Sequence, residues 1–448
     1  MPPSRSKPAR RNPETPVPPG DFMRSSSRGT SRARHGYRTA PPLTHGEESA
    51  EGAEIVREIA GADGVLLASA LRDLMLLIDP AARAPTPAVQ VPSAEWRENQ
   101  VRCVEDMGVA GPLAVLSVNR EPATADLPRV LYACRRIAAW AEERGAPATR
   151  LAFTQACALA DPSDTESALT VARLARELGQ HARAESWFRH TIKLSRGRHW
   201  EPYVWAYVGL GVLYIRSGNL PAARAMMDRA LRTAEHKRLR HLAGVAHHHL
   251  FHFAAETGQI RSAYDHARRA LEAYRGGHAA LPGLASDVGR FWLTLGEPGR
   301  ALPLFEQAQA VIADTNVRAM VTANVARAAA DLGAAERYER ARRDALELVA
   351  SARGRARIGE TYASLAYADL AMGEWPRAEA MARAALEIAA AAGEAEVRMI
   401  AEGQIEAARA GRAAGDHSGV SEGPVLARAA ERLGVDLAHA LTPPAALA

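Results

Sequence analysis

The sequence has 448 residues, of which 47% are hydrophobic and only 5% aromatic, and its many alanines, leucines, arginines and glutamates favour helix over sheet. No stretch approaches the roughly 18 apolar residues of a membrane-spanning helix, and no apolar segment follows the basic N-terminus as in a secretory signal. The formal net charge is +5, but nine basic and two acidic residues give residues 1–46 a charge of +7, so the rest of the chain carries −2.

Residues 1–48 form a tail rich in proline, serine, arginine and glycine, with almost no large apolar side chain. Such a segment buries too little surface to offset its chain entropy, so we predict that it is disordered. Its basic stretch RSSSRGTSRAR suggests an alternative function, a regulator that associates with nucleic acid through the tail. Deleting residues 1–48 tests this alternative, because any affinity for nucleic acid should then disappear.

The following region, 49–126, is predicted to be helical around a proline-rich linker. Apolar residues at three- to four-residue spacing predict a helix over 51–79, in which Gly61 and Gly64 are possible breaks. The dipeptide Asp79–Pro80 ends this helix, because proline restricts the residue before it to extended conformations.

The linker is expected to run to Pro92. Ser93 is then predicted to cap a short helix that continues to Met107, since a serine hydroxyl can accept a hydrogen bond from a free backbone amide. Asp126 opens a stronger helix, which ends at Gly145.

The chain from 163 to 412 repeats itself at intervals of about 39 residues. Six segments begin at a glycine and continue in a similar way, as in GNLPAARAMMDRAL and GEWPRAEAMARAAL. The six glycines are Gly179, Gly218, Gly258, Gly296, Gly333 and Gly373. Because glycine readily adopts positive φ, each is predicted to end one helix in a tight turn before the next helix begins.

Small residues recur at two fixed places in these repeats. Five residues after the glycine stand Ala184, Ala223, Ala263, Ala301 and Ala378, with Tyr338 as the exception. Twelve residues after the glycine stand Thr191, Ala230, Ala270, Ala308, Ala345 and Ala385. The two places are about two helical turns apart and share one face, so the second helix of each unit is predicted to approach its neighbours closely.

This helix–turn–helix pattern resembles the tetratricopeptide repeat (TPR) family. The best match is the stretch 207–231, where Tyr207, Leu210, Gly211, Tyr214, Gly218, Ala223 and Ala230 stand at motif positions. The sequence departs from the family pattern in two ways: the repeat is longer than the usual 34 residues, and the proline that often closes it is missing. Repeats of this greater length are similar to those of bacterial MalT-like arrays. The resemblance implies an all-α fold, a right-handed α-solenoid of helix pairs over 127–412.

Residues 413–448 depart from the repeat pattern. After a loop, VLARAAERLG at 425–434 is predicted to form an amphipathic helix that caps the array. The last residues are expected to fray.

In the TPR family the first helix of each pair lines a concave groove, which implies a partner site here. The corresponding candidates are Arg173, Arg176, Arg216, His248, His252, Arg290, Arg327 and Tyr367. Arginine pairs bidentately with carboxylates, so we expect a non-catalytic scaffold or regulatory sensor that binds a protein or peptide, specifically an acidic one. The alternative is that these arginines pair with acidic residues of neighbouring helices.

The stretch HHHLFHF, residues 247–253, raises the question of a metal site. His248 and His252 are four residues apart and share a helix face, a spacing at which imidazoles can bind zinc. A third ligand is not evident and the arginines nearby disfavour a cation, so the sequence predicts no metal and no cofactor. His247 is expected to pack in the core.

Motifs of common catalytic sites are absent. The sequence contains no GxxxxGK[ST], HExxH or GxSxG, so no enzyme is predicted. The glycines in GLG, 209–211, fall inside a predicted helix and indicate close packing. Cys103, Cys134 and Cys157 form no CxxC pair and are predicted to be reduced and buried in a cytoplasmic protein.

Overall fold

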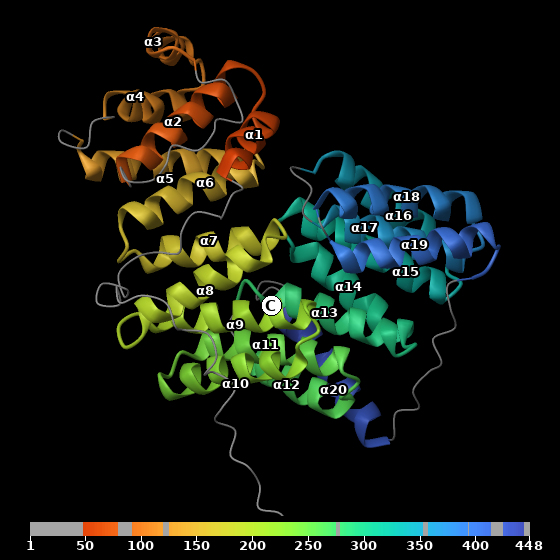
Figure 1. Cartoon of the computed structure of the whole chain (residues 1–448). Coiled ribbons are helices and arrows are strands. Elements are labelled where there is room, and N and C mark those ends of the chain that lie inside the picture. The colour runs from red at the N-terminus through yellow and green to blue at the C-terminus, as the bar shows by residue number, and fades with distance from the viewer. Residues whose placement is uncertain are drawn as a thin grey trace, which may run out of the picture. The chain divides into compact units, whose positions relative to one another are not determined.

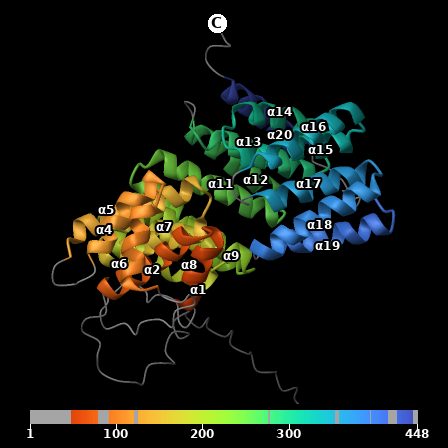
Figure 2. The ribbon, with the colours of Figure 1, turned by 90° about the horizontal axis from the view of Figure 1, so that it is seen from above.

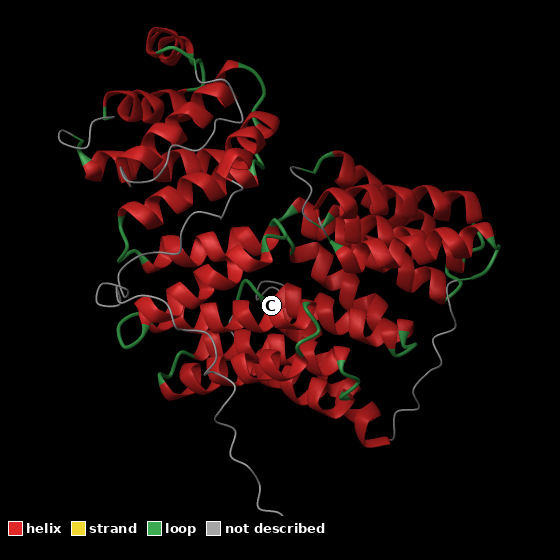
Figure 3. Cartoon of the chain, in the orientation of Figure 1, coloured by secondary structure: helices red, strands yellow, loops and turns green. Residues whose placement is uncertain are grey.

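The computed structural model of the chain describes residues 48–78, 92–119, 125–274, 278–352, 357–392, 394–413 and 424–442. Throughout these ranges the regular structure is helical, and Figure 3 shows helices joined by loops without a strand among them. The prediction of an all-α chain is thereby confirmed. The predicted tail before residue 48 and the proline-rich linker before residue 92 lie outside the described residues.

In the part of the chain that the structure describes, six helices precede the first predicted repeat. Figure 1 labels them α1 to α6. They are α1 (Glu48–Glu58), α2 (Ala62–Ile78), α3 (Ala94–Cys103), α4 (Met107–Val118), α5 (Leu127–Glu143) and α6 (Pro147–Ala160). The repeats follow as α7 (Thr165–Glu177), α8 (His181–Ser195), α9 (Trp200–Arg216), α10 (Leu220–His236), α11 (Arg240–Glu256), α12 (Ile260–Ala273), α13 (Leu281–Thr294), α14 (Pro298–Val311), α15 (Thr315–Asp331), α16 (Ala335–Ala350), α17 (Ile358–Ala371) and α18 (Trp375–Ala392). The chain continues with α19 (Ala395–Arg409) and α20 (Pro424–Leu441).

The helix starts predicted at Ser93 and Asp126 and the break at Gly61 are confirmed, whereas Gly64 lies inside α2 and breaks no helix. The expected helix over 51–79 divides at Gly61, whose φ is +80°, into α1 and α2. Ser93 caps α3, because its hydroxyl accepts a hydrogen bond from the amide of Trp96 at 3.1 Å. Asp126 caps α5 in the same way, and the turn after α5 contains Gly145 at φ +65°.

The boundary expected at Met107 is wrong. Helix α3 ends at Cys103, and Met107 is instead the first residue of α4. Pro112 lies inside α4, and a proline within a helix normally opposes helix formation. For this reason α4 was not predicted from the sequence. The helix is stabilised by burial of Val109, Leu113 and Leu116 in the core that α2, α4 and α5 share.

The repeat pattern is confirmed residue by residue. The six repeat glycines have φ values from +67° to +77°, and each stands in the turn between two helices of a pair. All the side chains five and twelve residues after them are buried, including the exceptional Tyr338. The hydroxyl of Tyr338 donates a hydrogen bond of 2.6 Å to Asp369 in the next repeat, which explains how a larger residue is accommodated.

The first helices of the pairs lie on one side of the array. Each of α7, α9, α11, α13, α15 and α17 contacts the next first helix, whereas no two successive second helices from α8 to α18 contact each other. Helices that are closer together on one side mark the inner side of a curved stack. We call the surface formed by these first helices the inner face.

Gly209 is a point of close contact between repeats. A Cβ atom at this position would lie 2.2 Å from Cζ of Phe188, a ring that is fully buried on α8. Gly209→Ala is therefore expected to lower the free energy of unfolding by about 1–3 kcal/mol, because the ring cannot move without disturbing its neighbours. Urea denaturation followed by circular dichroism measures the change.

Gly283 provides the matched control for this substitution. It also lies inside a helix, but a Cβ atom there would meet nothing within 4 Å. Gly283→Ala should be neutral or stabilising, since alanine is the better helix former by about 0.5–1 kcal/mol. Equal destabilisation by both substitutions would show that the contact with Phe188 is not the cause.

Helix α20 packs against the middle of the array instead of its end. It contacts α12, α13 and α14, and it makes no contact with α19, so the expected cap at the end is not formed (Figures 1 and 2). Ala430, Leu433 and Leu437 of α20 belong to the same apolar core as Trp292 of α13. The helix is also longer than the predicted stretch 425–434.

The described helices are not membrane-spanning in character, and the three cysteines differ in burial. Among the described helices, none combines the length and the hydropathy required to cross a membrane. Cys134 and Cys157 are buried and reduced as predicted, whereas Cys103 is exposed at the end of α3, so its predicted burial is wrong.

Candidate functional site

All eight residues proposed for partner binding lie on first helices of the array. Arg173 and Arg176 are on α7, Arg216 ends α9, and His248 and His252 are on α11. The remaining three, Arg290, Arg327 and Tyr367, are on α13, α15 and α17. Their placement is compatible with the inner face, and their role in binding stays a prediction.

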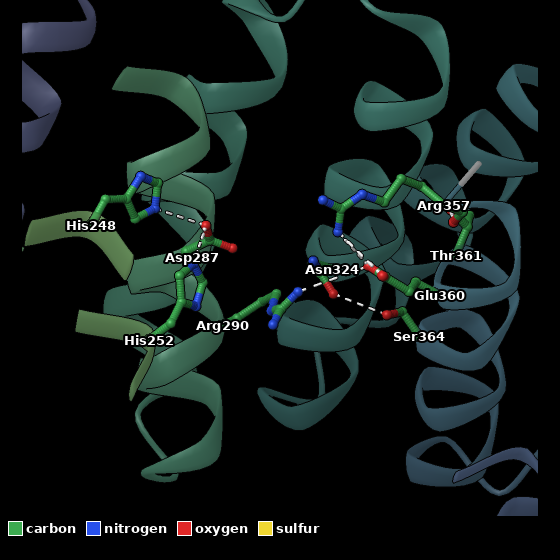
Figure 4. Close-up of polar contacts among 9 residues, drawn as sticks. All are labelled: His248, His252, Asp287, Arg290, Asn324, Arg357, Glu360, Thr361 and Ser364. Carbon is green, nitrogen blue, oxygen red and sulfur yellow. Dashed lines mark hydrogen bonds and ion pairs between the residues drawn. The ribbon is translucent and has the colours of Figure 1, made fainter. Parts of the chain in front are cut away.

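The two histidines converge on a carboxylate from the next first helix. The Nε2 atoms of His248 and His252 lie 3.0 and 2.9 Å from the same Oδ2 atom of Asp287 (Figure 4). The two imidazole rings are stacked, with centroids 5.2 Å apart and an interplanar angle of 17°. The i and i+4 positions on α11 produce this stacking, because they point to the same side of the helix.

Electrostatics keeps Asp287 ionised. Burial alone would raise the pKa of its carboxyl group, but His252, His248 and Arg290 outweigh burial and hold that pKa well below its usual range. For His248, burial lowers the pKa of the imidazole, and the hydrogen bond to Asp287, which acts in the opposite direction, does not outweigh it.

Arg290 and Arg357 share an acidic neighbour. Nη1 of Arg357 lies 3.0 Å from Glu360, and Nη1 of Arg290 lies 3.9 Å from the same carboxylate (Figure 4). Asn324 and Ser364 form a hydrogen bond of 3.1 Å beside them. This half of the inner face thus contains acidic partners for its cations, as the alternative interpretation of the arginines anticipated.

Arg327 and Tyr367 contact each other instead of standing free. The Arg327 guanidinium carbon is 3.9 Å from the centre of the Tyr367 ring, within the range of a cation–π interaction. Burial lowers the pKa of Arg327, although Tyr367 and Asp331 act in the opposite direction. This pair joins α15 to α17.

The arginines of α7 and α9 form a different environment, which we call the arginine cluster: Arg173, Arg176 and Arg216. Burial lowers the pKa of Arg176, and repulsion by Arg216, Arg173 and Arg357 lowers it further, while Glu177 opposes them at 3.7 Å. Arg173 lies over the ring of Trp205 at 5.5 Å. Within the described part of the chain, no carboxylate lies within ion-pair distance of Arg173 or Arg216.

Four residues of this site were not predicted from the sequence: Asp287, Asn324, Ser364 and Glu360. The first three stand nine residues before their repeat glycines, where His249 stands one repeat earlier. A polar residue at this place in four successive repeats was therefore a usable signal, because it lies next to the predicted groove positions. Glu360 has no such periodic signal, since it is near the start of α17.

His247 packs in the core, as predicted. It is buried, and its Nδ1 atom lies 3.0 Å from Nδ1 of His266 on α12. Burial lowers the pKa of His247 to about 4, with further contributions from His266 and Arg269. This histidine therefore contacts a different element from His248 and His252, which contact Asp287 on α13.

Comparison with known families identifies the repeats. The tetratricopeptide repeat family model matches residues 164–236, which correspond to helices α7 to α10. Residues 164–236 therefore carry tetratricopeptide repeats. The predicted likeness to MalT-like arrays is not tested by this match and stays a prediction. The search of curated proteins gives no significant match.

Several solved structures are similar to this helical array at low identity. BtubC (BKLC) from P. vanneervenii is 18% identical, with a TM-score of 0.37 over 49% of this chain and 91% of that chain. The APC/C heterotetramer Cut9–Hcn1 is 13% identical, with a TM-score of 0.42 over 78% of this chain and 64% of that chain. The TPR2AB domain of yeast Sti1 in complex with pHSP90 is 15% identical, with a TM-score of 0.24 over 63% of this chain and 99% of that chain.

Proposed function

We propose that the chain is a non-catalytic interaction module that binds an acidic segment of a protein or peptide on its inner face, with the arginine cluster as the anchor. Tetratricopeptide repeats present extended surfaces for partners, and the family match covers the two repeats that carry Arg173, Arg176 and Arg216. A regulatory or sensor role is compatible with the same surface.

The observation that supports this proposal is the imbalance of charge in the arginine cluster. Arg173 and Arg216 are exposed, Arg176 is half-buried, and the three guanidinium groups repel one another. The carboxylate of Glu177 lies 3.7 Å from Arg176, whereas Glu166 acts on Arg173, and Glu256 and Glu394 act on Arg216, from beyond ion-pair distance. A carboxylate-bearing ligand would relieve this repulsion and form charge-assisted hydrogen bonds, which are stronger than neutral ones.

The remaining candidates have a supporting part in this proposal. His248, His252, Arg290 and Arg327 already contact Asp287, Glu360 or Tyr367 of neighbouring repeats. A ligand would have to compete with these internal partners, so it should gain less from them. The proposal therefore places the acidic preference at α7 and α9, not along the whole row.

Fluorescence anisotropy with a labelled glutamate-rich peptide and a lysine-rich peptide of equal length tests the proposal. The glutamate-rich peptide should bind to the full chain, and the double variant Arg176→Glu/Arg216→Glu should weaken binding about 10- to 100-fold. This range corresponds to the loss of one charged hydrogen bond worth about 1.5–3 kcal/mol.

Arg232→Glu/Arg343→Glu is the matched control, because it changes the net charge equally. Both arginines are exposed on second helices, α10 and α16, away from the inner face. The control should bind nearly as well as the unmodified chain at physiological salt. Equal weakening of peptide binding by both double variants would show that the net charge of the chain, and not the arginine cluster, determines the affinity. A preference for the lysine-rich peptide would refute the proposal.

A further inference from the structure

We propose that His248, His252 and Asp287 form a binding site for a divalent transition-metal cation, for which Zn²⁺ is the best-suited ion. The three side chains offer two imidazole nitrogens and one carboxylate oxygen, and these ligand atoms all lie within 4.8 Å of one another. Zinc accepts this combination of donors at sites with three protein ligands. The site shares no residue with the arginine cluster, although His248 and His252 also have the supporting part in partner binding described above.

The geometry around Asp287 resembles the arrangement that a metal requires. Histidines at i and i+4 on one helix commonly bind zinc through both Nε2 atoms, and His248 and His252 both direct Nε2 to Oδ2 of Asp287 (Figure 4). Ligand atoms in a tetrahedral zinc site are about 3.3 Å apart, given metal–ligand bonds of about 2.0–2.1 Å. The observed Nε2–Oδ2 separations of 3.0 and 2.9 Å are slightly shorter than this value, and the two Nε2 atoms lie within 4.8 Å of each other.

The third ligand removes one objection raised by the sequence. The histidine pair lacked a further ligand in its own helix, and Asp287 supplies it from α13, the next first helix. Packing of α11 against α13 holds the two sides of the site together. The site therefore depends on the fold of two successive repeats and on the contact between them.

The second objection was the positive charge nearby. Arg290 and Arg357 both lie near Asp287, but the carboxylate of Glu360 pairs with both guanidinium groups. Glu256 adds a negative charge within electrostatic range of His252. The arginines are therefore offset by the chain's own acids, and a cation beside Asp287 does not meet an uncompensated positive field.

The cluster is open enough for an ion to enter. The side chains of His248, His252 and Asp287 are 14%, 28% and 19% exposed, so each is shielded but reachable from solvent. Three protein ligands leave a fourth tetrahedral position to water, which is the arrangement of zinc sites that remain open to other ligands.

Isothermal titration calorimetry of the chelator-treated full chain with Zn²⁺ tests the site. One ion per chain should bind at the cluster, and His248→Ala, His252→Ala and Asp287→Asn should each weaken that binding at least about tenfold, since even outer-shell changes cost 10–100-fold at metal sites. Asp287→Asn preserves the size of the side chain, so circular dichroism should show an intact fold.

His249→Ala is the matched control, because this neighbouring histidine is on the same helix but is not one of the three ligands. Its affinity for Zn²⁺ should equal that of the unmodified chain. Titration with Co²⁺ adds a spectroscopic readout, in which d–d bands should appear without a thiolate charge-transfer band. Unchanged affinity in Asp287→Asn, or a thiolate band from the cysteines, would place the metal elsewhere and overturn the proposal, as would the absence of saturable binding.

Discussion

Replacing Asp369 with alanine should lower the free energy of unfolding by about 3–5 kcal/mol, because the substitution leaves a buried positive charge without its partner. Asp369 is fully buried on α17. Its Oδ1 atom accepts hydrogen bonds from the Tyr338 hydroxyl at 2.6 Å and from Nε of Arg342 at 2.8 Å. Both donors are on α16, so the carboxylate links two successive repeats. Urea denaturation monitored by circular dichroism provides the measurement.

Two further variants separate the mechanism from a general effect of mutation. Asp344→Ala removes an exposed aspartate from α16 and should change stability by no more than about 0.5 kcal/mol. Asp369→Asn retains an acceptor for Tyr338 but loses the charge that pairs with Arg342, so its effect should be intermediate. If Asp369→Ala were as mild as Asp344→Ala, the hydrogen-bonded cluster would not be stabilising the contact between α16 and α17.

Trp292→Ala is the second substitution for which we expect a large loss, about 3–5 kcal/mol, the usual range for deleting a buried aromatic ring. Trp292 is only 1% exposed, and its Nε1 donates a hydrogen bond of 3.2 Å to the Tyr264 hydroxyl on α12. A Cβ atom on Gly434 of α20 would lie 3.2 Å from this ring, so the indole directly supports α20. The variant should also lose protection from hydrogen exchange over residues 424–441.

Trp200→Ala controls for the loss of a tryptophan as such. Trp200 is half-buried at the start of α9, where it contacts Lys237 and Tyr203. Its replacement should destabilise the chain clearly less and leave exchange over 424–441 unchanged. Full protection of α20 in the Trp292→Ala variant would mean that the helix is held by other contacts.

The features predictable from the sequence were those that the backbone or a periodic pattern determines. Gly218 and the other repeat glycines mark positive φ, and Ala223 and Ala230 mark close packing, so each repeat could be located without knowing its neighbours. The capping roles of Ser93 and Asp126 were also predictable from the sequence, because a helix cap depends on a few adjacent residues.

Other features depend on neighbours that a single sequence does not specify. Helix α4 contains Pro112, and burial of its apolar side outweighs the low helix propensity. The packing of α20 against Trp292 could not be predicted from the amphipathic pattern of α20. Such a pattern shows that one face of a helix is apolar, but it does not show which other helix packs against that face. In the candidate site, Asp287 meets His248 across two helices, and only the register between repeats brings them together.

The position of α20 changes how the array should lose its structure. In an ordinary solenoid each repeat contacts only adjacent repeats, so unfolding can begin at an end and proceed inward. Here Leu433 and its neighbours join the core around Trp292, about 140 residues earlier in the chain. This contact closes a long loop that contains α14 to α19, so α20 must separate from the core before the loop opens. The C-terminal half of the array is thereby coupled to its middle through a non-local contact, which raises the cooperativity of its unfolding and slows the completion of its folding.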